Sequence, residues 1–120
     1  MRWFPRTAVV AASALTAIGN DFGFEAIFGR QLEALARPGD VALGISTSGR
    51  SENIVVGLRA AHEAGARTVA LTGRSPGAVG AAADDTVSVP ADDVARIQEC
   101  HILIGHVICE LVESLLVEGA

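Results

Sequence analysis

Residues 40–54 constrain the fold of this chain most, because three kinds of sequence follow one another there without a break. An apolar run at 41–45 stops in the residues Ser-Thr-Ser-Gly-Arg-Ser at 46–51. An amphipathic segment then begins at Ile54. This order predicts a buried strand, a tight turn and the N-terminus of a helix. The chain is therefore expected to contain a strand–helix unit whose turn is rich in hydroxyl groups.

The predicted turn is well suited to bind a phosphate monoester. A helix N-terminus presents unpaired backbone N–H groups and the positive end of the helix dipole, which attract anions. Ser46, Thr47, Ser48 and Ser51 add hydroxyl donors. The stretch lacks both the lysine of a nucleotide P-loop and the three-glycine dinucleotide fingerprint. We expect a small phosphorylated metabolite; the alternative is that these residues only cap the helix.

Composition fits one small domain with a sizeable core. The chain has 120 residues, of which 50% are hydrophobic and 19% are charged. All nine basic residues are scattered arginines and the net charge is −5, which disfavours a nucleic-acid surface. No apolar run reaches the roughly 20 residues of a membrane span. Cys100 and Cys109 are about 13 Å apart if they share a helix, too far for a disulfide, so they indicate small buried apolar residues in a reducing, cytoplasmic compartment.

The first 14 residues allow two interpretations. A basic start, an apolar run and Ala-Ser-Ala at 12–14 are typical of a short signal peptide. The alternative is an ordinary buried strand at 7–12. Composition leaves both open, and the resemblance described below favours the strand.

Strands and helices alternate along the rest of the chain. A polar turn is expected at 19–21, helices at 24–37 and 51–64, and strands at 41–45, 68–72 and 86–89. A short helix at 78–83 and a long one at 94–118 complete the pattern. Such alternation predicts an α/β fold with a parallel sheet and right-handed crossovers. Ligands in these sheets bind at the carboxyl ends of strands, here the 46–51 turn and Thr72-Gly73.

The long helix carries three polar residues of interest. It is apolar on nearly every side, so we expect other helices to bury it, including helices of another subunit. Gln98 and His106 are eight residues apart, about 80° around the helix axis, and can converge on one pocket. His101 is about 140° from His106 and should face elsewhere. A histidine on an apolar helix is more often a core residue than a functional one.

Several segments together resemble the sugar isomerase (SIS) domain and, within it, the phosphoheptose isomerases. They lie at residues 17–24, 38–41, 44–49, 71–73 and 95–101, followed by His106. The Ser-Thr-Ser-Gly turn marks the superfamily. The Gly-Asn-Asp-Phe-Gly-Phe and Arg-Ile-Gln-Glu segments resemble the narrower family. The resemblance implies a single SIS domain over residues 1–120, folded as a flavodoxin-like three-layer α/β sandwich with a parallel sheet and a long C-terminal helix.

The resemblance also implies a function. It implies isomerisation of sedoheptulose 7-phosphate to D-glycero-D-manno-heptose 7-phosphate, for bacterial activated-heptose biosynthesis, by a homotetramer with active sites between subunits. Ser46, Thr47, Ser48 and Ser51 would hold the phosphate, and Asn20 and Asp21 would contact substrate, the aspartate in a neighbouring subunit's site. Gln98 and His106 would belong to a zinc-binding catalytic centre, with His106 as general acid/base. Histidine as a residue type suits that role, because it can gain and lose a proton near neutral pH.

Two departures from the family pattern stand out. Members carry an upstream segment with a long helix, a Gly-Asn-Gly-Gly-Ser loop and a His…Glu pair. A glutamate in that segment supplies the catalytic base, and the pair completes the zinc site. Nothing in these residues resembles that segment, so the domain is expected to be N-terminally truncated and the isolated chain weakly active or inactive. Arg50 stands where relatives often have Asn. It either contacts phosphate or extends into solvent.

Other functions remain as alternatives. One is a non-catalytic SIS module that binds sugar phosphate or associates with the replication initiator, although His106 favours enzyme ancestry. Another is a different SIS enzyme, such as an arabinose-5-phosphate isomerase, or a sugar-phosphate-sensing domain. A secreted binding domain rests only on the signal-like N-terminus.

Overall fold

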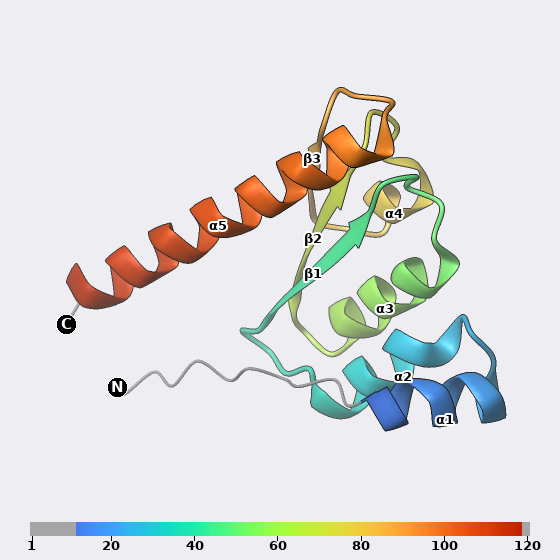
Figure 1. Ribbon diagram of the computed structural model, residues 1–120. Helices are drawn as coiled ribbons and strands as arrows, with labels where there is room; N and C mark the ends of the chain where they lie inside the picture. The colour runs from blue at the N-terminus through green and yellow to red at the C-terminus, as the bar shows by residue number, and fades with distance from the viewer. Residues whose placement is uncertain (1–11, 119–120) are drawn as a thin grey trace.

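The computed structural model describes residues 12–118, which form a parallel sheet with helices stacked against it (Figure 1). The elements are α1 (Ala12–Phe22), α2 (Ala26–Leu35), β1 (Val41–Ser46), α3 (Glu52–Glu63), β2 (Arg67–Thr72), α4 (Gly77–Ala81), β3 (Asp85–Ser88) and α5 (Val94–Glu118). The predicted α/β class, parallel sheet and long C-terminal helix are confirmed.

The three strands lie in the order β1-β2-β3 and end at the same level. Ser46 pairs with Thr72, and Thr72 pairs with Ser88. The segments that follow the strands, residues 47–51, 73–76 and 89–93, therefore leave the sheet at one edge. This carboxyl edge is the place where ligands bind in parallel sheets.

Helix α3 forms the centre of the core. Val55 and Leu58 of α3 pack with Ala70 of β2 and Val79 of α4. Helix α2 covers the other side of α3, where Gly29 lies so close to Val56 that an added Cβ would be 2.7 Å from its side chain. Helix α1 packs on α2 as the outermost layer (Figure 1).

The opposite face of β1 is not covered by the residues that the structure describes. Along β1 the alternate residues Val41, Leu43 and Ile45 are exposed, whereas Gly44 and Ser46 are buried. Large apolar side chains exposed to this extent on a strand are unusual for a sheet covered on both faces. The three-layer sandwich predicted from the sequence has a helical layer on each face of the sheet. The described residues supply one of these layers, formed by α3 with α2 behind it.

Helix α5 is held at only one end. It crosses near the carboxyl edge of the sheet and then runs away from the other elements (Figure 1). Ile97 and His101 are its buried residues within 94–118. The prediction that both cysteines are buried is wrong, because Cys100 is half-buried and Cys109 is exposed on the free part of the helix. Its exposed large apolar residues are Val94, Ile102, Leu103, Val107, Ile108, Leu111, Val112, Leu115, Leu116 and Val117. By length and hydropathy α5 would also pass as a membrane-spanning helix, but a single helix of this kind is weak evidence for a membrane.

The N-terminal region differs from the sequence-based expectation. The turn predicted at 19–21 is wrong, because these residues complete α1, which ends at Phe22. Gly19 lies beside α2, where an added Cβ would make an ordinary contact with Ile27 at 3.5 Å. The chain turns instead at Gly23, whose φ is +95°. The strand predicted at 7–12 lies outside the described residues, apart from Ala12, which begins α1.

Near the amino ends of β2 and β3, Thr68 and Asp84 are joined by hydrogen bonds in both directions. The Asp84 carboxylate accepts hydrogen bonds from the Thr68 backbone N–H at 2.8 Å and from the Thr68 hydroxyl at 3.0 Å. The Asp84 backbone N–H in turn donates to Thr68 Oγ1 at 3.0 Å. The backbone hydrogen bond, followed by the side-chain one, lowers the pKa of Asp84 from its ordinary value of 3.8.

This pair predicts a pH-dependent contribution to stability. Because the folded-state pKa of Asp84 is lowered, its contribution is full above pH 3.8 and is lost as the pH falls through the folded-state pKa. Asp84→Asn should therefore lower the melting temperature at pH 7, and the gap to the parent chain should narrow below about pH 4. Asp85→Asn removes the same charge from an exposed pair with Arg67 and should have a smaller effect. A pH-independent gap would contradict the assignment.

Candidate functional site

The turn after β1 is held together by its own hydroxyl groups. Ser46 is buried, and its Oγ lies 2.8 Å from Ser51 Oγ. Ser46 Oγ also accepts the backbone N–H of Gly49 at 3.2 Å. Ser51 is the N-cap residue of α3 but makes no side-chain capping bond, because its hydroxyl faces Ser46 instead. The turn thus links the end of the strand to the start of the helix.

Gly49 places this turn against the segment that follows β2. Its φ is +67°, and an added Cβ would lie 2.5 Å from Ser75 O and 2.6 Å from Pro76 O. The carbonyl of Gly49 accepts the N–H of Val79 at 3.0 Å. Only a residue without a side chain fits this position, so the two loops pack directly backbone to backbone.

A cavity of about 390 Å³ opens beside the turn at the carboxyl edge of the sheet. All three post-strand segments and α5 contribute to it. Its lining residues are Thr47, Ser48, Arg50, Arg74, Ser75, Gly77, Ala91, Asp92 and Ile97. The cavity thus combines hydroxyl and guanidinium groups, the donor types that bind phosphate.

The structure divides the four predicted phosphate-binding residues into two pairs. Thr47 and Ser48 line the cavity. Ser46 and Ser51 bond to each other inside the turn and hold its shape. Ser48 Oγ accepts the backbone N–H of Arg50 at 3.2 Å, which leaves the hydroxyl hydrogen free to be donated. Contact with a ligand is therefore expected first from Thr47 and Ser48.

Sequence reasoning did not single out Arg74 and Asp92. Arg74 Nε donates to Asp92 Oδ1 at 2.9 Å, and Arg74 Nη2 donates to Pro90 O at 2.9 Å. These contacts tie the segment after β2 to the segment after β3. The sequence indicated only that a strand ends at Thr72, so that Arg74 lies in a loop at the carboxyl edge. It did not indicate that Arg74 pairs with Asp92, which is 18 residues further along the chain.

The other predicted site residues do not line this cavity. Gln98 directly follows the lining residue Ile97 but is exposed on α5, and His106 is exposed two turns further along. Asn20 and Asp21 lie at the end of α1, where Asn20 Nδ2 donates to Asp21 Oδ1 at 2.8 Å. Neither residue of that pair lines the cavity. Their functional roles remain predictions.

The described residues do not form a complete zinc site. Within residues 12–118, no group of three or more His, Cys, Asp or Glu side chains is placed to hold a metal ion. Gln98 and His106 would provide two ligands at most, whereas a zinc site needs at least three from the protein. His101, the other histidine of α5, is buried and donates from Nε2 to Thr72 O at 3.0 Å. It faces the core, as predicted.

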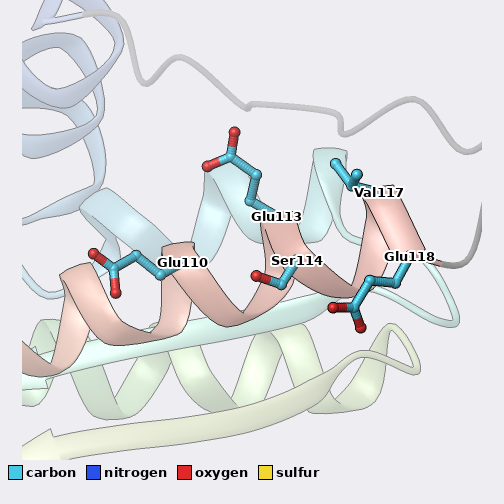
Figure 2. Close-up of a pocket in the computed structure, with 5 residues that line it drawn as sticks. All are labelled: Glu110, Glu113, Ser114, Val117 and Glu118. Carbon is cyan, nitrogen blue, oxygen red and sulfur yellow. The ribbon is translucent and has the colours of Figure 1, made fainter.

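A second hollow, of about 410 Å³, lies far along α5. Figure 2 shows that its lining residues, Glu110, Glu113, Ser114, Val117 and Glu118, all belong to this one helix. Three of the five are carboxylates, which repel a phosphate group. The hollow is the surface of an exposed helix and is not a competing anion site.

Comparison with known proteins identifies the class to which this fold and turn belong. The family model described as SIS domain matches residues 2–73. The chain belongs to the SIS-domain family.

Within that family the chain is similar to phosphoheptose isomerases. It is 59% identical over 106 residues to the phosphoheptose isomerase of Aquifex aeolicus, covering 88% of this chain and 56% of that protein. It is 53% identical to the one from Geotalea daltonii, covering 96% of this chain and 60% of the relative. The chain thus spans somewhat over half the length of these relatives.

Solved structures give the same result. A phosphoheptose isomerase from Neisseria gonorrhoeae matches with a TM-score of 0.82 and 49% identity, over 86% of this chain and 58% of that chain. One from Francisella tularensis matches with a TM-score of 0.81 and 42% identity, over 85% and 55% of the two chains. These matches confirm the predicted fold, which this chain shares with the solved phosphoheptose isomerases.

Proposed function

We propose that this chain forms the phosphate-binding part of a sugar-phosphate isomerase that converts sedoheptulose 7-phosphate to D-glycero-D-manno-heptose 7-phosphate. The reaction would serve activated-heptose biosynthesis in the cytoplasm. The observation that carries the proposal is the cavity at the carboxyl edge, lined by Thr47, Ser48 and Arg50. The similar proteins are named phosphoheptose isomerases, which supports the coarser assignment to a sugar-phosphate isomerase.

The turn suits a phosphoryl group for physical reasons. The first turn of α3 begins directly after Ser51, so its unpaired N–H groups and dipole add to the hydroxyls of Thr47 and Ser48. The Ser46–Ser51 hydrogen bond keeps these donors in place before a ligand arrives. A preorganised donor set binds an anion without a further ordering cost.

The isomerisation needs more than a phosphate site. A proton must leave C2 of the aldose, or C1 of the ketose, to form an enediol and return to the other carbon, while a second group protonates the carbonyl oxygen. We assign His106 as general acid/base and Gln98 as a polar contact in the same centre. Asp92 is the one carboxylate in the cavity lining, and one of its oxygens accepts a hydrogen bond from Arg74. The base is expected from outside the described residues.

Assembly and metal binding are part of the same proposal. We propose a homotetramer in which Asn20 and Asp21 reach substrate, the aspartate in a neighbouring subunit's site, because both are exposed and neither lines the chain's own cavity. The exposed apolar residues of β1 and α5 suit burial between subunits. Zinc would take Gln98 and His106 together with further ligands from outside the described residues.

Removal of the cavity hydroxyls tests the phosphate site. Ser48→Ala and Thr47→Val should each weaken binding of sedoheptulose 7-phosphate about fivefold, since each loses one net hydrogen bond. Binding can be followed by amide chemical shifts during an NMR titration of the 120-residue chain. Ser114→Ala removes an exposed hydroxyl on α5 and serves as the matched control. Equal affinities for all four proteins would contradict the assignment.

Measuring both isomerisation and binding by the 120-residue chain distinguishes the proposed isomerase from a non-catalytic SIS module. We expect the chain to bind the sugar phosphate weakly and to isomerise it slowly or not at all. Full turnover by these residues alone would show that the base lies within them. Absence of binding, in contrast, would favour a SIS module that acts through protein partners.

A further inference from the structure

Arg50 is the cavity residue whose role the proposed function leaves open. Its side chain is exposed and lines the cavity together with Thr47 and Ser48. An arginine at such a place either contacts the ligand or points into solvent. The charges around it decide between these two possibilities.

The charged groups of the cavity are not equivalent. Arg74 is compensated by Asp92 at 2.9 Å, and another of its N–H groups is used by Pro90 O. Arg50 forms no ion pair with the described residues. The lining therefore holds one uncompensated positive charge, that of Arg50. An incoming anion would meet this charge without having to displace a partner.

The backbone of Arg50 is also fixed relative to the turn. Its N–H donates to Ser48 Oγ at 3.2 Å. On either side, Gly49 packs against the loop after β2 and Ser51 begins α3. The base of the arginine side chain is thus held in place while its guanidinium is free to move toward a ligand.

We propose that Arg50 is a specificity-determining residue whose guanidinium pairs with the phosphoryl oxygens of the bound sugar phosphate and favours the dianion. This inference rests on the proposed function. Arginine stays protonated at every relevant pH and forms two parallel hydrogen bonds to phosphate. A phosphate monoester gains its second negative charge near pH 6, so the contribution of Arg50 should grow between pH 5 and pH 8.

The experiment compares Arg50→Gln with Arg59→Gln in the 120-residue chain. Arg59 is exposed on α3, forms no ion pair with residues 12–118 and does not line the cavity, so its substitution makes the same change in net charge elsewhere. Sedoheptulose 7-phosphate and unphosphorylated sedoheptulose are each titrated at pH 5 and pH 8, at low ionic strength and in salt. Amide chemical shifts report both the affinity and the intactness of the fold.

We expect Arg50→Gln to weaken binding of the sugar phosphate about tenfold at pH 8, with a smaller loss at pH 5 and in salt. Arg59→Gln should bind almost as the parent chain does. If the parent chain binds and Arg50→Gln binds equally well, the role of Arg50 is overturned while the proposed function stands. The role of Arg50 is also overturned if Arg50→Gln and Arg59→Gln lose the same affinity for the sugar phosphate, or if Arg50→Gln loses the same affinity at pH 5 as at pH 8. If the parent chain does not prefer the phosphorylated sugar, both proposals fail.

Discussion

Gly49→Ala should destabilise the chain by about 2–4 kcal/mol and abolish phosphate binding. Two causes add at this position. An alanine at φ +67° is strained, and its Cβ would lie 2.5 Å from Ser75 O and 2.6 Å from Pro76 O. Both contacts are with backbone, which cannot rotate away as a side chain can. The two loops must therefore separate, and the cavity between them opens.

A matched glycine separates the two causes. Gly39 also has a positive φ, +91°, but an added Cβ there would meet nothing within 4 Å. Gly39→Ala should therefore cost only about 1 kcal/mol, from backbone strain alone. Urea unfolding of both variants measures the difference, and the NMR titration with sedoheptulose 7-phosphate measures the site. Similar unfolding free energies for the two variants would show that the loops do not pack as described.

The strand, turn and helix around residues 40–64 could be predicted because local signals agree there. The apolar run ends where β1 ends, and Ser51 occupies the N-cap of α3, as the hydroxyl-rich turn indicated. Gly65, at φ +89°, follows the helix as expected. The bounds of α5 also match the prediction. In these places propensity, capping and hydrophobic period all favour the same structure.

The turn predicted at 19–21 failed because tertiary contacts outweigh local preference. Gly, Asn and Asp are poor helix formers, so the sequence favours a turn. In the structure these residues continue α1, which packs along α2 with Gly19 beside Ile27. The break falls at Gly23, where the positive φ needs a glycine. The local sequence does not indicate whether the chain turns at Gly19 or at Gly23.

The candidate site could be predicted only in part. Thr47 and Ser48 follow from the position of the turn at the carboxyl edge. The pairing of Arg74 with Asp92 depends on how two loops 18 residues apart meet, which the sequence pattern does not encode. Helical geometry places Gln98 and His106 on one side of α5, but it does not supply the surface that they face. Both side chains are exposed among the described residues.

His101→Ala should cost about 2–3 kcal/mol and free the start of α5 from the sheet. His101 is 5% exposed and donates from Nε2 to Thr72 O at 3.0 Å, and Thr72 O also accepts the N–H of Val89. Together with Ile97 it forms the whole buried part of α5 among residues 94–118. The carbonyl of Thr72 thus holds α5 at the end of β2 through His101, and it holds the segment that precedes α5 through Val89.

The ring chemistry of His101 suggests the variant that tests this role. Because a carbonyl can only accept, Nε2 carries the hydrogen in this bond, and Nδ1 is buried without a partner among the described residues. A glutamine can place an N–H near Nε2 and carries no group that titrates. His101→Gln should therefore recover much of the lost stability, whereas His101→Leu should not, although it fills similar space.

Hydrogen exchange distinguishes this positioning role from general destabilisation. With His101→Leu, the amides of residues 94–101 should exchange faster than those of α3, because a helix held by two buried residues loses one of them. Exchange that rises equally in α3 and α5 would contradict the proposed role. So would a glutamine variant no better than leucine, because the hydrogen bond to Thr72 would then contribute nothing. The position of Gln98 relative to the cavity depends on the same bond, since it lies between Ile97 and His101 on the helix.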